Sequence, residues 1–154
     1  MNEPVFTSAL HYRDPKAALP WLGQAFGFEI TMAIDGPPDA PQYCHYEMSV
    51  QGRGRVMIGG EWNDAARSPA SVDGVNTQSV HVQLLSGLDD HCAHARSVGA
   101  QIVQEPEDQF YGDRVYRAVD LEGHQWTFSQ HVRDVSLAEA ETALGQPIIA
   151  TSWD

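Results

Sequence analysis

The 154-residue sequence predicts an α+β fold built from two similar modules. Hydrophobic periodicity gives the order strand, helix, strand, strand, strand over residues 5–61, and the same order returns over residues 78–132. The glycines expected to end the two helices, Gly27 and Gly99, lie 72 residues apart. Because one such module is too small to bury its sheet well, we expect the two to pair. The prediction is a curved, mixed eight-stranded sheet with an open cup on its concave side.

We treat the whole chain, 1–154, as a single domain. Its predicted parts are a first βαβββ module at 5–61, a linker at 62–77, a second βαβββ module at 78–132 and a helical tail at 133–154. The linker is polar and contains Ser, Pro, Asp and Gly, which favour loops. In the tail, Ser136 followed by Glu139 predicts a capping box at a helix start.

The first module is expected to contain strands at 5–13, 28–34, 42–51 and 55–60. Asp14 followed by Pro15 predicts a helix start, since Asp is a good N-cap and proline fits the first helical position. Leu19, Leu22 and Phe26 continue at helical spacing. In the strand at 42–51, alternate residues from Cys44 onward are expected to face the core.

The second module is expected to contain strands at 79–85, 101–104, 114–120 and 125–132. A helix at 89–98 is predicted to start with an acidic cap, and 105–113 is predicted to be a long loop. Alternation in the first of these strands places Val80 and Val82 toward the core. It places His81 and Gln83 on the opposite face.

The composition excludes several classes of protein. Nine Lys and Arg against 21 Asp and Glu give a net charge of −12, which repels nucleic-acid phosphates and anionic lipid surfaces. The same field favours a cationic ligand. No apolar run reaches the length of a membrane span. Two cysteines are too few for a disulfide scaffold, so we expect a protein of the reducing cytoplasm.

Three segments carry a family resemblance. Residues 14–29, DPKAALPWLGQAFGFE, resemble the first strand and helix of the vicinal oxygen chelate superfamily of glyoxalase I, bleomycin resistance proteins and extradiol dioxygenases. Residues 108–114, DQFYGDR, and 120–126, DLEGHQW, are similar to its PhnB-like small glyoxalase-like subgroup. The resemblance covers about residues 5–132. It implies paired βαβββ modules, a homodimer and a ligand held in the cup.

The resemblance also bears on a metal cofactor. Metal-dependent members use a divalent ion to stabilise an anion formed on two neighbouring substrate oxygens. Carried over, the four metal-ligand positions fall on Thr7, on Met57 or Gly59, on His81 and on Thr127. Only His81 has a suitable side chain, and such sites need about three. We therefore assign no metal and no cofactor, and keep a divalent ion at His81 as the alternative.

The candidate ligand-binding residues are those expected to line the cup or its rim. They are Thr7, His11, His45, Glu47, Met57, Glu61, Trp62, His81, Gln83, Tyr111, Arg114 and Thr127. Stacking on a planar ligand and plain packing are equally good interpretations for Trp62 and Tyr111. For Arg114 an ion pair is favoured over binding a ligand carboxylate.

Three functional hypotheses follow. The first is a glyoxalase-like or bleomycin-resistance-like protein that binds a small organic molecule, as resistance members bind cationic drugs between subunits. The alternative is a metal-dependent lyase, isomerase or dioxygenase with a rearranged site around His81, whose catalytic residues are unknown. A degenerate, non-catalytic domain is the third. The helical pair His91 and His94 is expected to be solvated and to hold no functional metal.

Overall fold

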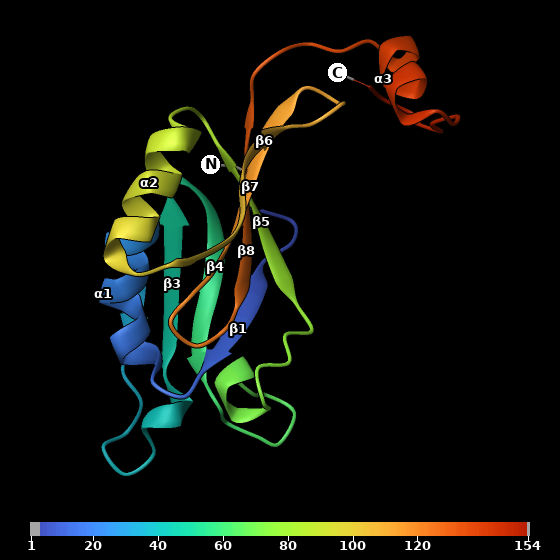
Figure 1. Ribbon diagram of the computed structural model, residues 1–154. Coiled ribbons are helices and arrows are strands. Elements are labelled where there is room, and N and C mark those ends of the chain that lie inside the picture. The colour runs from blue at the N-terminus through green and yellow to red at the C-terminus, as the bar shows by residue number, and fades with distance from the viewer. Residues whose placement is uncertain (1–3, 154) are drawn as a thin grey trace.

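The computed structural model describes residues 4–153 and consists of two four-stranded sheets and their helices (Figure 1). The first sheet has the order β1 (Ser8–Tyr12), β4 (Arg53–Gly60), β3 (His45–Val50), β2 (Phe28–Ile34). The second has the order β5 (Ser79–Leu84), β8 (Gln125–His131), β7 (Asp113–Val119), β6 (Gln101–Asp108). The predicted α+β class and the two βαβββ modules are confirmed. The eight strands are hydrogen-bonded as two sheets of four rather than as one continuous sheet.

Both sheets follow the same pairing scheme. The first strand of each module pairs in parallel with the last one, and the other pairs are antiparallel. Leu10 lies opposite Ile58 in the first sheet, and Val82 lies opposite Phe128 in the second. All four are buried, so the alternation expected from the sequence sets the helix-facing side of each sheet.

The first helix, α1 (Pro15–Phe26), starts and ends as predicted. The Asp14 side chain accepts a hydrogen bond from the Ala17 amide at 3.0 Å. Gly27 ends the helix with a φ of 72°, a left-handed conformation that favours glycine. Both caps depend only on residues close together in the sequence, and for this reason they could be predicted from the sequence.

The second helix, α2 (Leu88–Val98), starts differently from the prediction. An acidic cap was expected, but the residue before the helix is Gly87, and it makes no side-chain cap. The free Leu88 amide instead donates to Gln130 Oε1, 2.9 Å away on β8. The acidic residues Asp89 and Asp90 lie inside the first turn, where the helix dipole favours negative charge.

Several other boundaries also differ. β1 starts at Ser8 rather than at residue 5, and β6 continues to Asp108, into the first part of the loop predicted at 105–113. Two irregularities in its register with β7 let the polar stretch continue as a strand. Short 3₁₀ helices occupy Pro41–Tyr43 and, in the linker, Pro69–Ser71. In the tail, α3 (Leu137–Leu144) has the predicted capping box at Ser136 and lies apart from the sheets (Figure 1).

One aromatic core joins the two modules. Phe26, at the end of α1, contacts the rings of Trp126 and Phe128 on β8, with centroids 5.8 and 4.8 Å apart. The helices α1 and α2 also pack on each other. Trp126 is 1% exposed, so it is part of this core. In the described part of the chain, no helix is long and apolar enough to cross a membrane.

Two histidines of α2 hold this helix pair together. The expectation that both are solvated is wrong for His91, which is half-buried, whereas His94 is exposed as expected and still bonds to α1. His91 Nε2 donates to the Phe26 carbonyl at 2.8 Å, and its Nδ1 lies 2.6 Å from the Tyr116 hydroxyl. His94 Nε2 donates to the Gln24 carbonyl at 2.7 Å. Because a carbonyl only accepts, Nε2 of His91 carries the proton, and neutral Nδ1 accepts from the tyrosine.

This arrangement makes stability depend on pH. Burial lowers the pKa of His91 below its ordinary value of 6.5. As pH falls, His91 is protonated in the unfolded chain before it is protonated in the folded one. The contribution of His91 to the free energy of unfolding is therefore present above pH 6.5 and is lost as pH falls below it. We expect His91→Gln to reduce the loss of unfolding free energy seen between about pH 8 and about pH 5.

Urea unfolding across this pH range measures the effect. His131→Gln is the matched control with the opposite sign, because the hydrogen bonds that the His131 ring donates to Asp134 and Asp113 raise its pKa. That histidine stabilises the fold below its ordinary pKa and loses its effect as pH rises. An unchanged pH slope in His91→Gln would contradict the assignment.

Candidate functional site

Each sheet has one side that faces away from the helices, and these sides carry most of the predicted site residues. The module-1 face is defined by Ala9, His11, His45, Glu47, Arg55 and Met57. The module-2 face is defined by Ser79, His81, Gln83, Arg117, Thr127 and Ser129. These residues alternate with buried ones such as Leu10 and Val82, which fixes the side on which they lie.

The module-1 face has an ordered polar centre on Glu47. Although it lies on the open side, Glu47 is only 8% exposed, because its neighbours cover it. His45 Nε2 lies 3.0 Å from Glu47 Oε1, and Arg55 Nη1 lies 3.7 Å from Oε2. Arg55 Nε also donates to Thr7 Oγ1 at 3.4 Å. The sequence indicated three of these four residues, and Arg55 is the addition.

The module-2 face has its own ordered centre. His81 Nε2 lies 2.7 Å from Ser129 Oγ, and this hydroxyl lies 2.6 Å from Gln83 Oε1. His81 and Gln83 are exposed, whereas Ser129 is fully buried. Thr127 pairs with His81 in the parallel ladder, and Arg117 follows next to it on β7. Ser129 was missed because a lone serine in an alternating strand carries no sequence signal of its own.

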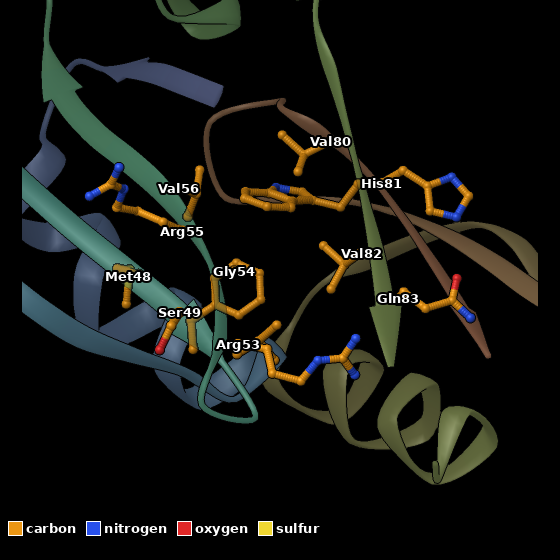
Figure 2. A pocket seen from close by; sticks show the side chains of 13 residues that line it. Met48, Ser49, Arg53, Gly54, Arg55, Val56, Val80, His81, Val82 and Gln83 are labelled. Atoms are coloured by element: carbon orange, nitrogen blue, oxygen red, sulfur yellow. The ribbon is translucent and has the colours of Figure 1, made fainter. Parts of the chain in front are cut away.

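A seam separates the two faces. It contains a cavity of about 260 Å³ between the β3–β4 hairpin and β5. All four residues from Val80 to Gln83 line this cavity. Figure 2 shows the side chains of Val80 and Val82 on the cavity side of β5 and those of His81 and Gln83 on its other side. Arg55 points away from the seam in the other direction. Within one chain, the two polar centres therefore face different sides.

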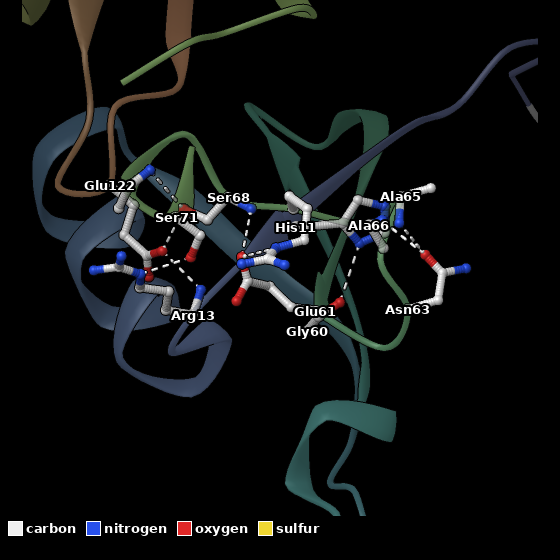
Figure 3. Close-up of polar contacts among 12 residues, drawn as sticks. His11, Arg13, Gly60, Glu61, Asn63, Ala65, Ala66, Ser68, Ser71 and Glu122 are labelled. Carbon is white, nitrogen blue, oxygen red and sulfur yellow. Dashed lines mark hydrogen bonds and ion pairs between the residues drawn. The ribbon is translucent and has the colours of Figure 1, made fainter. Parts of the chain in front are cut away.

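Three residues predicted to bind ligand lie near the end of β4, and one of them, Glu61, bonds to the linker instead. Glu61 Oε1 accepts from the Ser68 amide at 2.9 Å and from Arg67 Nε at 3.2 Å (Figure 3). His11, which belongs to the module-1 face, donates from Nδ1 to the Gly60 carbonyl at 3.2 Å. Trp62 is 51% exposed. Glu61 therefore acts in the structure as a linker anchor.

The remaining two predicted residues lie at the β6–β7 turn and on β7. Arg114 donates to Asp89 at 2.8 Å and to Asp108 at 2.9 Å. This is the ion-pair role favoured above, with partners other than the nearest acids in sequence. Tyr111 contacts the Phe110 ring edge-on, with centroids 5.2 Å apart, and lines a groove beside Trp153 of the tail. The structure thus places neither residue with His81.

The residues present do not fit a classical metal centre. Of the positions that the family resemblance assigns to metal ligands, Thr7, Met57 and Thr127 carry side chains that do not suit such an ion, and only His81 offers a suitable donor. Among residues 4–153, no three His, Cys, Asp or Glu side chains are grouped so that they could hold an ion. The two polar centres offer hydrogen bonds and charge, and these define the chemistry of the site.

Comparisons with known proteins agree with this architecture. An uncharacterized protein of Mycobacterium bovis is 26% identical over 146 residues, which cover 92% of this chain and 93% of the relative. The crystal structure of TioX from Micromonospora sp. ML1 is 31% identical and has a TM-score of 0.65, covering 86% of this chain and all of TioX. TnmS3, an antibiotic-binding protein from Streptomyces sp. CB03234, shares the fold at 16% identity and a TM-score of 0.63, over 84% and 97% of the two chains.

A family model supports the same conclusion. The model described as Glyoxalase/Bleomycin resistance protein/Dioxygenase superfamily matches residues 7–128, which contain all eight strands except the last residues of β8. The narrower PhnB-like resemblance stays a prediction. The chain belongs to the glyoxalase/bleomycin resistance protein/dioxygenase superfamily.

Proposed function

We propose that this protein binds a small organic molecule in a cup formed by a module-1 face and a module-2 face, without a classical metal centre. The observation that carries the proposal is the pair of ordered polar centres on these faces. Each combines side chains held by defined hydrogen bonds with exposed groups beside them, as at Glu47 and at His81. Ligand sites commonly combine a few such fixed polar groups with apolar walls.

The cup is proposed to need a second copy of the chain. Arg55 of the module-1 centre and His81 of the module-2 centre extend in opposite directions in Figure 2, so a ligand is proposed to reach both kinds of face only when a second chain adds its own. The edge strand β2 also exposes Ile30, Met32 and Ile34, each more than two-fifths accessible. Exposed apolar groups in a row favour a protein interface. A homodimer is therefore part of the proposal.

The expected ligand is a planar, cationic or neutral molecule. The net charge of −12 attracts cations at long range, and the Glu47 carboxylate supplies a local partner on the module-1 face. The fold relative TnmS3 is described as an antibiotic-binding protein, which supports antibiotics as the first ligands to test. Antibiotic sequestration is therefore the first activity to examine.

The test is a titration of the isotope-labelled protein with planar aromatic antibiotics, cationic and neutral, followed by two-dimensional NMR. Saturable shifts are expected at β3, β4, β5 and β8. Glu47→Gln is expected to weaken a cationic ligand by about tenfold, since one charge-assisted contact is lost. Arg96→Ala is the control, because this exposed arginine pairs with Glu105 on the helix side.

Light scattering is expected to give twice the mass of one chain. Shifts confined to the helices, or a monomer that binds ligand with unchanged affinity at all dilutions, would contradict the proposed cup.

A further inference from the structure

The module-2 face contains a hydrogen-bond relay of three side chains. Ser129 Oγ stands between His81 Nε2, 2.7 Å away, and Gln83 Oε1, 2.6 Å away. Gln83 is the direct ladder partner of Ser129, and His81 lies two residues earlier on the same side of β5. The serine is fully buried, so the relay is shielded from water at its middle and exposed at its two ends.

Counting protons fixes the direction of the relay. A serine hydroxyl has one proton to give, and the Gln83 carbonyl oxygen can only accept it. The second contact of Ser129 must then be one that the serine accepts, so neutral His81 carries its proton on Nε2. As a result, His81 Nδ1 is left as an acceptor, and the Gln83 amide nitrogen is left with its donors.

We propose that the module-2 face recognises a neutral amide or lactam edge, whose N–H donates to His81 Nδ1 and whose carbonyl accepts from Gln83. Ser129 is the positioning residue that fixes this polarity. The inference rests on the proposed function and names the chemistry of one of its two faces. It also explains why a serine is buried beneath two exposed polar side chains.

The same polarity disfavours other groups. A carboxylate is disfavoured because it has no proton to donate to the lone pair of His81 Nδ1. An ammonium is disfavoured because it has no lone pair to accept a hydrogen bond from the Gln83 amide. Arg117, next to Thr127 in the row that contains His81, adds a further donor and repels cations. A cationic group of the same ligand therefore belongs on the module-1 face, near Glu47.

The polarity can be tested without any ligand. Nitrogen-15 NMR of the histidine rings at about pH 8, where histidine is neutral, is expected to show His81 as the Nε2–H tautomer. Ser129→Ala is expected to give a mixture of tautomers, and Ser129→Thr, which keeps the hydroxyl, is expected to restore the single form. A merely structural serine would leave the tautomer unchanged, and finding the Nδ1–H form in the unaltered protein overturns the proposal.

The ligand class is tested with oxindole and N-methyloxindole. Both are planar and uncharged, and they differ only in the lactam N–H. Oxindole is expected to bind about tenfold more tightly, and Gln83→Met or His81→Phe is expected to abolish that difference. Gln125→Met, on the neighbouring strand of the same face, is the matched control and is expected to preserve it.

The outcomes separate this inference from the proposed function. Equal binding of the two probes, with shifts on either face, overturns the lactam proposal while supporting a small-molecule site. Failure of oxindole to shift the signals of His81 and Gln83 up to its solubility limit also overturns it. If planar antibiotics fail as well to shift signals on either face, the proposed function itself is wrong.

Discussion

Asp120→Ala is expected to destabilise the protein by about 3–5 kcal/mol, because it leaves several buried donors without an acceptor. Asp120 is 7% exposed and follows β7. Its Oδ2 accepts from the Tyr12 hydroxyl at 2.6 Å and from Trp126 Nε1 at 3.0 Å. Its Oδ1 accepts from the amides of Glu122 and His124, both at 3.0 Å.

The contact with Tyr12 makes this carboxylate a link between modules. Tyr12 lies at the end of β1 and is fully buried, and Asp120 lies 108 residues later. Burial and the charge of Asp120 raise the pKa of Tyr12 well above its ordinary value, so the hydroxyl keeps the proton that it donates. Loss of the carboxylate thus weakens the turn before β8 and the junction with β1 together.

Urea unfolding followed by circular dichroism measures the change. Tyr12→Phe removes one donor and is expected to cost only about 1–2 kcal/mol. Asp39→Ala, in an exposed loop, is expected to stay within about 0.5 kcal/mol of the unaltered protein. An Asp120→Ala protein as stable as the Asp39→Ala control would contradict the role given to this carboxylate.

The parts of the fold that the sequence predicted are those set by neighbouring residues. Asp14 caps α1 through Ala17, three residues away, and Ser136 caps α3 through Glu139. The alternation of β3 likewise placed Tyr46 and Glu47 on opposite sides of the first sheet, although both side chains are buried. A periodic pattern of burial is visible in the chain before any tertiary contact forms.

The parts that could not be predicted depend on residues far apart in sequence. His91 looked like a solvated helix residue, yet its partners are Phe26 and Tyr116, 65 and 25 residues away. Capping of α2 by Gln130 is of the same kind. Such contacts follow from how the modules dock, which no local pattern contains.

For the candidate site, the sequence predicted on which side of a strand each residue lies, but not how the strands are arranged around it. Alternation correctly placed His81 and Gln83 away from the core, and His45 and Glu47 on one strand. The sequence could not show that these pairs would lie on two faces, because that depends on the seam between β4 and β5. It also missed Ser129, although the parallel ladder that pairs it with Gln83 follows from the repeat of the first module.

Phe26→Ala is expected to cost about 3–5 kcal/mol and to destabilise both modules at once. Phe26 is fully buried, and its ring lies among Trp21 and Phe28 of the first module and Trp126 and Phe128 of the second. Removing it opens a cavity between the modules, because the backbone of α1 is held in place by its own caps. The conservative Phe26→Leu variant fills most of that space and is expected to cost less.

The shape of the unfolding curve tests the shared core. The NMR signal of the Trp126 indole N–H reports on the second module, and far-ultraviolet circular dichroism reports on both. Since the aromatic cluster spans the two modules, the two signals are expected to change at the same urea concentration, in the unaltered protein and in Phe26→Ala alike. Independent modules would instead give a dichroism curve with two steps, of which the variant would shift only one. In that case each face would sit on a separately stable unit, and its binding groups would survive loss of the other module.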